Sequence, residues 1–243
     1  MKNWHKGAII VISVKLSPRL KTLADNIKIG SVVADIGTDH ALLPIFLVEN
    51  EICNEVYACD IGDGPIDRAG TYVRKKLGPD CSKITLMKCD GLDGVPNHCD
   101  TIVIAGMGGE LIADILSRGY GDRTAKLILQ PMTSIDKLRK YLYDNDFHIV
   151  DETIVKEMEH RYYSVIIAEP GKQEYENLDI YASKPLREKR DKISLNFIEK
   201  IYRTQRAKIR GMRTSRLTKE EDLRYETTVF KEIENYLEEE KRR

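Results

Sequence analysis

The sequence predicts an α/β fold in two parts, a mostly parallel sheet with an antiparallel edge followed by a helical hairpin. Two patterns in the 243 residues support this. Short β-branched runs alternate with helical patterns as far as Pro170-Gly171, and beyond this dipeptide almost no strand signal remains. We therefore expect residues 1–170 to form one domain and residues 171–243 to form a second, helical one.

The first helix is expected to begin at Ser17-Pro18, because a serine cap followed by proline is a favoured helix start. Strands are expected near residues 32–36, 55–60, 84–88, 101–105 and 125–130, with helices near 40–50, 64–77, 109–118 and 134–145. Two further β-rich runs, 147–156 and 162–168, flank a polar turn and predict a hairpin. Five alternating units closed by a hairpin are typical of a Rossmann-like domain.

Residues 174–212 and 219–240 predict two long helices separated by a polar stretch. Each helix carries a thin apolar stripe. The stripes are Ile193, Phe197, Ile201, Ala207 and Ile209 on the first helix, and Leu223, Val229, Phe230, Ile233 and Leu237 on the second. Because two such helices can cover each other's stripes within one chain, we expect an antiparallel hairpin and a monomer.

With 42% hydrophobic and 32% charged residues, the chain can build a core and is expected to be soluble. Its five cysteines form no CxxC pair, which argues against a metal site or redox motif and suits a reducing cytoplasm. The apolar segment 8–14 resembles a signal peptide but lacks a small-residue cleavage site, and it is too short to span a membrane. We expect an edge segment or an extension ahead of the domain, in a cytoplasmic protein without metal or membrane contact.

The first strand ends on an acidic turn that contains a glycine, Asp35-Ile36-Gly37-Thr38-Asp39-His40. Ligands of open α/β sheets bind at such strand ends, and Gly37 allows a sharp turn or a close approach. Asp39 and Ala41 stand where a dinucleotide site would have glycines, and an anionic Asp39 repels a pyrophosphate. S-adenosylmethionine carries an ammonium and a sulfonium but no phosphate, so acidic side chains favour it. A plain strand-to-loop turn is the alternative.

The second and third strands also end on acidic side chains. Asp60 lies 25 positions beyond Asp35, close to the spacing at which a carboxylate binds ribose hydroxyls. Asp90-Gly91 can place a carboxylate beside an adenine amino group, although the same dipeptide is common in ordinary turns.

The fourth strand ends on three glycines within four positions, Gly106, Gly108 and Gly109. This density indicates that another group approaches the backbone closely, either a phosphate or a flat aromatic base. The P-loop pattern of a phosphate site is missing. The fifth strand ends on Gln130-Pro131. Because parallel strands end at one rim, these signatures together predict a ligand site there.

Residues 200–219 contain eight basic and no acidic side chains. The eight are Lys200, Arg203, Arg206, Lys208, Arg210, Arg213, Arg216 and Lys219. Several recur at three- and four-residue steps, which places them along one helix face and over its tip. Solvated faces usually mix both signs, so this run indicates a polyanion such as RNA or DNA phosphate.

Taken in order, six motifs resemble those of the bacterial tRNA (adenine-22-N1)-methyltransferases. The motifs are Leu16-Ser17-Pro18-Arg19-Leu20, the turn from Asp35 to Ala41, Asp60, Asp90-Gly91-Leu92, Ile104 to Gly109, and Leu127 to Pro131. The resemblance spans roughly residues 15–240. It implies a class I methyltransferase domain followed by a helical coiled-coil domain that binds tRNA. The chain departs from the family pattern at Leu42, where we expect an aromatic residue.

The resemblance also implies S-adenosylmethionine as cofactor and N1 of adenine 22 in the D-arm of tRNA as the methylated atom. The implied cofactor residues are Arg19, Asp35, Ile36, Gly37, Thr38, Asp39, His40, Asp60, Ile61, Asp90, Gly91, Ala105, Gly106 and Met107. The implied substrate residues are Gly108, Gly109, Gln130, Pro131, Lys200, Arg203, Arg206, Arg210 and Arg213. Asp39 and His40 are the candidate catalytic residues, as proton acceptors for the exocyclic amine. The alternatives are a methyltransferase for another RNA position, a small molecule or a protein, and a non-catalytic RNA-binding module.

Overall fold

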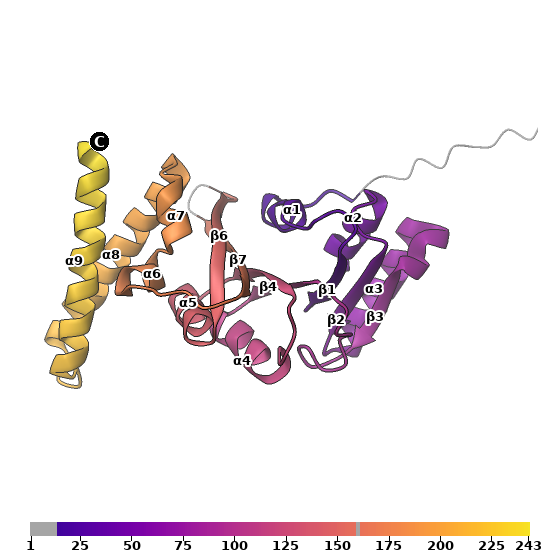
Figure 1. Cartoon of the computed structure of the whole chain (residues 1–243), viewed down its shortest axis with the longest axis horizontal. Helices are drawn as coiled ribbons and strands as arrows, with labels where there is room; N and C mark the ends of the chain where they lie inside the picture. The colour runs from indigo at the N-terminus through magenta and orange to yellow at the C-terminus, as the bar shows by residue number, and fades with distance from the viewer. Residues whose placement is uncertain (1–13, 159–160) are drawn as a thin grey trace, which may run out of the picture.

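The protein forms a seven-stranded sheet with helices on both faces, followed by a group of helices at one end of the sheet (Figure 1). The computed structural model describes residues 14–158 and 161–243, so the expected edge segment lies outside the described residues except for Val14. The strands are β1 (Val32–Ile36), β2 (Glu55–Asp60), β3 (Ile84–Lys88), β4 (Thr101–Met107), β5 (Lys126–Pro131), β6 (Phe147–Lys156) and β7 (Tyr162–Pro170). The helices are α1 (Pro18–Asp25), α2 (Leu42–Glu49), α3 (Asp63–Leu77), α4 (Gly109–Gly119), α5 (Ile135–Asp144), α6 (Asn177–Tyr181), α7 (Lys184–Lys189), α8 (Lys192–Thr214) and α9 (Glu220–Arg242), with a 3-10 turn at Gly78–Lys83.

The strands follow the order β3-β2-β1-β4-β5-β7-β6, and β1 to β5 run parallel. β7 pairs antiparallel with both β5 and β6, so the predicted hairpin forms the antiparallel edge of the sheet. The prediction of a mostly parallel, Rossmann-like sheet is confirmed, and the strand boundaries agree within two residues. The direction of winding reverses between β1 and β4, which creates the position where open α/β sheets bind ligands.

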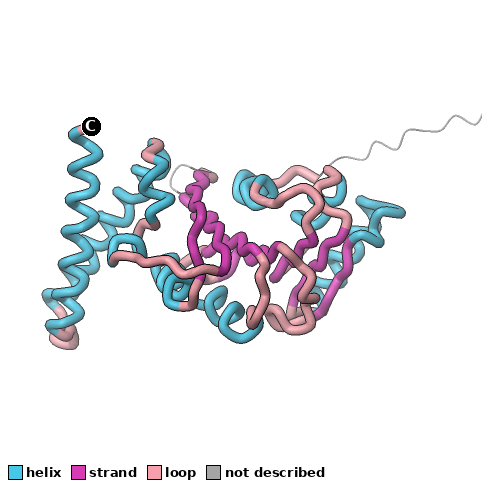
Figure 2. The backbone as a smooth tube through the Cα atoms, viewed as in Figure 1, coloured by secondary structure: helices cyan, strands magenta, loops and turns pink. Residues whose placement is uncertain are grey.

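The sheet is buried on both faces. Helices α1, α2 and α3 pack on one face, where Leu23 and Val103 belong to the same apolar core. Helices α4 and α5 pack on the other face, where Ile104 meets Ile112 and Leu138. Neighbouring residues of β4 therefore face opposite cores, because side chains alternate along a strand. Figure 2 shows helices on both sides of the central strands.

The prediction of one long helix over residues 174–212 is wrong. Two short helices, α6 and α7, precede the long helix α8. Ser183 caps α7, and Pro185 stands in its first turn, where a missing N–H costs no helical hydrogen bond. Arg190 ends α7 with a φ of 50°, and the Asp191 carboxylate caps α8 by accepting two backbone hydrogen bonds. These local caps divide a segment whose composition alone is helical.

Helices α8 and α9 form the expected hairpin. The buried members of the predicted stripes are Phe197, Ile209, Val229, Ile233 and Leu237. The assignment of Ile193 and Ala207 to the apolar contact is wrong, because both are exposed. Ile198 is fully buried instead, since α8 packs on Ile154 of β6 as well as on α9.

A buried ion pair joins α5 to the edge of the sheet. Arg139 donates from Nη2 to Glu152 Oε1 at 2.6 Å and from Nε to Glu152 Oε2 at 3.0 Å, and both side chains are excluded from water. Arg139 Nη1 also donates to the backbone carbonyls of Ile180 and Tyr181 in α6. One side chain thereby connects the sheet-bearing domain to the first of the C-terminal helices.

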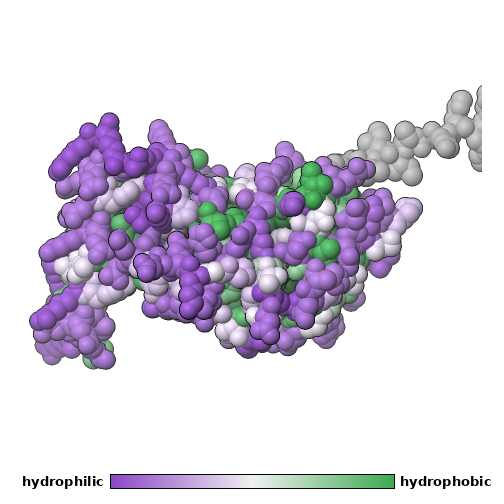
Figure 3. Space-filling model, in the orientation of Figure 1, coloured by the Kyte–Doolittle hydropathy of each residue, from purple (hydrophilic) through white to green (hydrophobic). Residues whose placement is uncertain are grey.

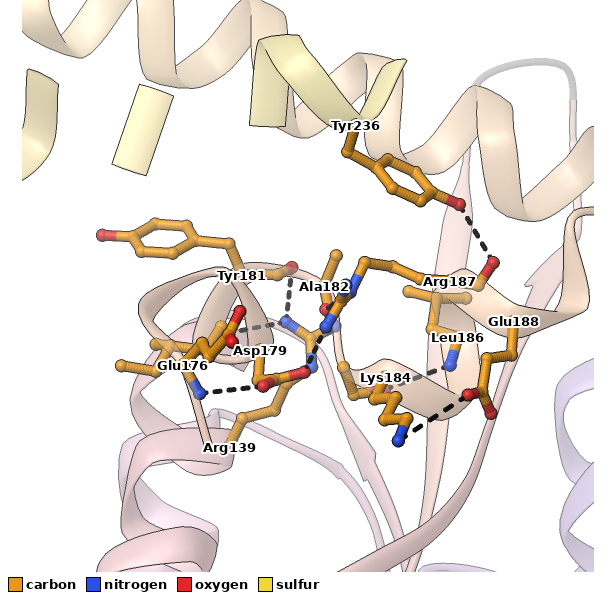
Figure 4. Close-up of polar contacts among 12 residues, drawn as sticks. Arg139, Glu176, Asp179, Tyr181, Ala182, Lys184, Leu186, Arg187, Glu188 and Tyr236 are labelled. Atoms are coloured by element: carbon orange, nitrogen blue, oxygen red, sulfur yellow. Dashed lines mark hydrogen bonds and ion pairs between the residues drawn. The ribbon is translucent and has the colours of Figure 1, made fainter. Parts of the chain in front are cut away.

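Three further contacts hold the C-terminal helices to this junction. Ser183 donates its hydroxyl to Glu152 at 2.6 Å. Arg187 of α7 donates to Asp179 of α6 at 2.5 Å, and Tyr236 of α9 donates to the Arg187 carbonyl at 2.9 Å. Figure 4 shows Arg139 of α5 beside Tyr181, Asp179 and Arg187, with Tyr236 of α9 directed at Arg187. Polar contacts therefore link α5 and β6 to α6, α7 and the long helix α9.

The visible surface of the C-terminal helices is mostly hydrophilic, whereas apolar patches lie over the sheet-bearing domain (Figure 3). Within the described parts of the chain, no helix has both the length and the apolar character needed to cross a membrane.

Replacing Arg139 with leucine is expected to lower the free energy of unfolding by about 3–5 kcal/mol, because the Glu152 carboxylate then stays buried without its partner. Leucine at both positions is expected to recover part of this loss. Urea unfolding followed by circular dichroism measures the changes. Lys140→Ala removes an exposed ion pair on the same helix and serves as the control, with an expected change below about 0.5 kcal/mol. An Arg139→Leu loss no larger than that of the control would contradict the assignment.

Candidate active site

A cavity of about 320 Å³ lies at the carboxyl ends of β1 and β4, where the winding of the sheet reverses. It brings together side chains that are far apart in the sequence. Its lining, which we call the cofactor cavity, consists of Arg19, Leu20, Asp35, Gly37, Thr38, Asp39, His40, Leu42, Leu43, Ala105 and Gly106. Most of these residues are ones that the sequence assigned to a cofactor.

Asp35 is the buried acid of the cofactor cavity. Burial raises the pKa of Asp35 to about 6; a hydrogen bond with Thr38 opposes the rise, and the charge of Asp60 adds to it. Gly37 has a φ of 81°, a conformation that favours glycine. The N–H groups of Gly37 and Thr38 both donate to the Cys59 carbonyl, at 2.8 and 2.9 Å. The turn is therefore anchored to β2 and holds its carboxylate in a confined position.

Asp39 and His40 lie at the exposed mouth of the cavity. Arg68 of α3 donates to Asp39 Oδ1 at 2.8 Å, and His40 Nε2 lies 3.3 Å from Asp39 Oδ2. The hydrogen bond from Arg68 holds the pKa of Asp39 below its usual value. A carboxylate of lowered pKa accepts protons poorly, so Asp39 is better suited to supply a fixed negative charge than to act as a base.

Arg19 ties α1 to the rim of the sheet. Its Nη1 donates to Gln130 Oε1 at 2.8 Å, and its backbone N–H donates to Glu157 Oε1 at 2.7 Å. The guanidinium carbon lies 5.2 Å from the centre of the Tyr163 ring. Within the described chain, Arg19 Nε is buried without a hydrogen-bond partner. An unsatisfied cationic donor in a cavity wall fits an anionic group of a ligand.

Gln130 and Pro131 end β5 and are both buried. Gln130 is fully buried, and both ends of its amide are used, since Oε1 accepts from Arg19 and Nε2 donates to the Pro131 carbonyl at 2.9 Å. Neither residue lines the cofactor cavity, and Gln130 contributes by orienting Arg19.

The three glycines at the end of β4 and the start of α4 have different surroundings. Gly106 lines the cofactor cavity with a φ of 79°. Gly108 caps the N-terminus of α4. A Cβ at Gly109 would collide with the backbone carbonyl oxygens of Thr133 and Ser134, and the Gly109 N–H donates to Thr133 O at 2.8 Å. Gly109 therefore allows α4 to pack against the loop between β5 and α5, and its position is explained without a ligand.

Four predicted cofactor residues lie beyond the cavity, at the ends of β2 and β3. Asp60 is oriented by the Gly62 N–H, which donates to Oδ1 at 2.8 Å, and the neighbouring Ile61 is 65% exposed. Asp90 accepts from Arg118 at 3.3 and 3.4 Å. Gly91, next to Asp90, has a φ of 62°. These residues continue the rim away from the β1–β4 reversal.

Two predicted residues face the protein interior. Ile36 is buried in the core beneath α4 and α5, so only its backbone borders the turn. The methyl end of Met107 occupies the space beside Gly37 that a side chain would fill, which gives Gly37 a packing reason in addition to its φ angle.

The basic residues of α8 lie on two faces of the helix. Arg203 and Arg206 line a hollow beside α9, whereas Lys200 and Lys208 line a second hollow beside the loop between β5 and α5. Arg210 and Arg213 are exposed further along α8. The hollow at α9 also contains Glu199, Glu234 and Glu238. Acidic side chains from outside the basic stretch therefore reduce the positive charge that the sequence suggested.

Sequence reasoning missed Arg68, Glu157 and Tyr163. Arg68 orients Asp39 from α3, and the other two hold Arg19 from the β6–β7 hairpin. No local pattern marks them, because their roles depend on tertiary contacts. Within residues 14–158 and 161–243, no three His, Cys, Asp or Glu side chains are grouped so that they can hold a metal ion.

The fold and the cavity define a methyltransferase, since residues 16–166 match the family model of the methyltransferase domain. The tRNA (adenine(22)-N(1))-methyltransferase of Bacillus subtilis is 40% identical over 174 residues, which cover 70% of this chain and 72% of that protein. The chain belongs to the tRNA (adenine(22)-N(1))-methyltransferase family. The resemblance seen in the sequence motifs is thereby confirmed.

Solved structures agree over nearly the whole chain. The m1A22 tRNA methyltransferase TrmK of Bacillus subtilis superposes with a TM-score of 0.76 at 31% identity, covering 94% of this chain and 98% of that one. A putative tRNA (m1A22) methyltransferase of Streptococcus pneumoniae, in complex with S-adenosyl-L-methionine, gives a TM-score of 0.78 at 28% identity, covering 92% and 100%. The similarity extends through the C-terminal helices.

Gly109→Ala is expected to lower the free energy of unfolding by about 1–3 kcal/mol, because its Cβ overpacks the carbonyls of the β5–α5 loop. The matched control is Gly211→Ala in α8, where a Cβ meets no atom within 4 Å and helix propensity favours alanine. Thermal unfolding of both variants measures the contrast. Equal free energies of unfolding for the two variants would contradict the prediction, because they would show that the β5–α5 loop can move to accommodate the added methyl group.

Proposed function

We propose that the protein transfers the methyl group of S-adenosylmethionine to N1 of adenine 22 in the D-arm of tRNA. The observation that carries the proposal is the acidic cofactor cavity at the ends of β1 and β4, in a chain that belongs to the family named for this reaction. The protein is proposed to act as a cytoplasmic monomer, with residues 1–170 as the catalytic domain and residues 171–243 as the tRNA-binding domain.

The cavity suits S-adenosylmethionine by charge. The amino acid end of this molecule carries an ammonium and a carboxylate. Asp35 and Asp39 supply negative charge for the ammonium, and the unpartnered Nε of Arg19 suits the carboxylate. Further along the rim, Asp60 is proposed to bind ribose hydroxyls, and the exposed side chain of Ile61 offers an apolar surface for a purine ring. When bound, this cofactor supplies an electrophilic methyl group.

The target adenine brings its own nucleophile, because N1 carries a free lone pair at neutral pH. The chain therefore has to expose the base and orient it, which is mainly a task of positioning. Ala105 and Gly106 form the floor for the ring. Asp39, kept ionised by Arg68, stabilises the positive charge that the adenine gains. His40 lies beside Asp39, where it can accept a proton from the exocyclic amine.

The exposed arginines of α8 are proposed to contact tRNA phosphates. Arg203, Arg206, Arg210 and Arg213 recur at three- and four-residue steps and share one side of the helix. Contacts of this kind fix the position of the nucleic acid without reading its sequence. Recognition of the target adenine is then a role of the cofactor cavity.

Unmodified bacterial tRNA incubated with the protein and labelled S-adenosylmethionine is expected to yield 1-methyladenosine, mapped to position 22. Nucleoside mass spectrometry with fragment mapping measures it. Asp35→Ala is expected to reduce kcat/KM by about 10- to 100-fold, the cost of losing one charge-assisted hydrogen bond to the ligand. Methyl transfer to another nucleoside would overturn the assignment in favour of a different RNA position. No transfer to tRNA despite confirmed cofactor binding would leave small-molecule and protein acceptors.

Affinity for S-adenosylmethionine is expected to fall in acid. The pKa of Asp35 is about 6 in the free protein, and the ionised carboxylate is the form that binds an ammonium. Below pH 6 a proton must leave before binding, so the apparent Kd rises about tenfold at pH 5 relative to pH 7.5. Isothermal titration calorimetry across this range measures the effect. Asp35→Asn is expected to bind weakly at every pH, and a wild-type profile as flat as that of the variant would refute the role of Asp35.

The raised pKa of Asp35 also affects the stability of the ligand-free protein. Acid favours the folded state here, whereas it weakens cofactor binding. Because folding raises the pKa of Asp35, the proton stabilises the folded state. This contribution is fully present below the unfolded pKa near 4 and is lost as the pH rises through about 6. At neutral pH the buried charge is therefore a cost that a bound cation offsets.

A further inference from the structure

A second hollow, of about 340 Å³, lies between the loop after β5 and helix α8. It is lined by Met132 from the loop, Asp136 from the first turn of α5, Tyr162 from β7, and Phe197, Lys200 and Lys208 from α8. We call it the α8 groove. Its volume is at the lower end of the range of about 300–1,000 Å³ found for small-ligand sites. It is thus large enough for one small ligand or one unit of a polymer.

The α8 groove adjoins the cofactor cavity. Met132 lines the groove, and its sulfur lies 3.4 Å from Nη1 of Arg19, which lines the cavity. Met132 is 44% exposed, and its backbone is fixed to the glycine run because its N–H donates to the Met107 carbonyl at 2.7 Å. The contact between Met132 and Arg19 thus links the linings of the two hollows. A polymer with one unit in the cavity can therefore reach the groove with the next.

Two of the three basic side chains that line the α8 groove are already paired. Lys208 is paired with Glu226 at 2.6 Å, and Arg139 is used entirely by Glu152 and backbone carbonyls. Lys200 has no ion-pair partner among the described residues, and its Nζ lies 5.8 Å from the centre of the Tyr162 ring. An uncompensated ammonium beside an aromatic ring is a suitable contact for a phosphate.

The other walls suit a base. Tyr162 and Phe197 lie with ring centres 6.3 Å apart and a tilt of 54°, and Tyr162 is partly exposed. Aromatic side chains of this kind stack with unpaired bases regardless of sequence. Asp136 adds one carboxylate, which can accept hydrogen bonds from an exocyclic amino group. An aromatic wall, a free ammonium and a carboxylate are together complementary to one nucleotide.

We propose that the α8 groove holds the nucleotide next to the target adenine, with Tyr162 against its base and Lys200 at its phosphate. This inference rests on the proposed function, since it concerns the same RNA. An extruded base needs its neighbours held apart from the stack, and contacts to flanking nucleotides set substrate choice in enzymes that act on extruded bases. The groove therefore provides a subsite beside the cofactor cavity. This subsite selects RNA in which the nucleotide next to the target adenine is accessible and unstacked.

The test is a double-mutant cycle between Tyr162 and the RNA. Unmodified synthetic tRNA is compared with two versions that carry an abasic ribose at position 21 or 23. With the wild-type enzyme, one of the abasic sites is expected to lower kcat/KM by about 5- to 100-fold. On intact tRNA, Tyr162→Leu is expected to lower kcat/KM by a similar factor. On the abasic RNA that the wild-type enzyme methylates poorly, the same substitution is expected to lower kcat/KM little further. Independent, multiplicative losses on both abasic RNAs would overturn the subsite.

Lys200→Gln provides the second measurement. Removing one phosphate contact is expected to weaken tRNA binding and to reduce the slope of log Kd against log salt by about 0.7–0.9. Lys192→Gln, an exposed lysine on the same helix but outside the groove, is the matched control and should keep the wild-type coupling with the abasic RNAs. An unchanged salt slope for Lys200→Gln would also count against the subsite.

Two controls separate failure of the subsite from other failures. Unchanged affinity of Tyr162→Leu for S-adenosylmethionine shows that the catalytic domain is intact, and Tyr162→Phe, which keeps the ring, is expected to restore the coupling. If the wild-type enzyme does not methylate intact tRNA at all, the proposed function fails, and the subsite fails with it. If intact tRNA is methylated but no coupling appears, the subsite alone is refuted.

Discussion

The ion pair between Arg139 and Glu152 is the interaction on which the placement of the C-terminal helices against the sheet depends. Burying two charges costs several kcal/mol per ion, and attraction offsets this only when geometry and further hydrogen bonds are good. Here the pair is bidentate, and the hydroxyls of Ser164 and Ser183 donate to the same carboxylate. Burial alone would raise the pKa of Glu152, but Arg139 and the two serines hold it below its usual value.

This pair also explains why the long hairpin occupies a defined place beside the rim. The remaining donor of Arg139 binds the carbonyls that end α6, and α7 follows directly from Ser183. Helix α8 is therefore held next to the loop after β5, where it forms one wall of a groove adjoining the cofactor cavity. A flexible link would bring tRNA near the cavity without fixing which nucleotide enters it.

Much of the fold was predictable because it follows local rules. Buried β-branched runs identified the strands, and the acidic and glycine-rich strand ends identified the rim, since parallel strands all end on one side. The order of β6 and β7 was harder, because it depends on which edge the hairpin joins. The division of residues 174–191 into two helices was missed, although Ser183-Lys184-Pro185 and Asp191 are cap signals that a pattern based on composition overlooks.

The site was predictable in composition but not in its contacts. The acidic turn indicated Asp35 and Asp39, and the family resemblance implied Arg19. The partners that set their charge and orientation come from distant elements. Gly109 illustrates the same limit. Three glycines in a row of four suggested a ligand, but one of them is needed for the approach of a neighbouring loop. A sequence pattern shows that space is needed, and the tertiary structure decides what fills it.

The first two residues of β7 limit how the length of the β6–β7 hairpin can change during evolution. Tyr163 lies under Arg19 at the cofactor cavity, and Tyr162 lies beside Lys200 in the α8 groove. Because side chains alternate along a strand, a shift of the β7 register by one residue would move each ring to the opposite face of the sheet. Both hollows would then lose their tyrosine at once. The length of the turn between β6 and β7 is thus constrained by contacts on both faces of β7, and insertions tolerated in most surface loops should be rare here.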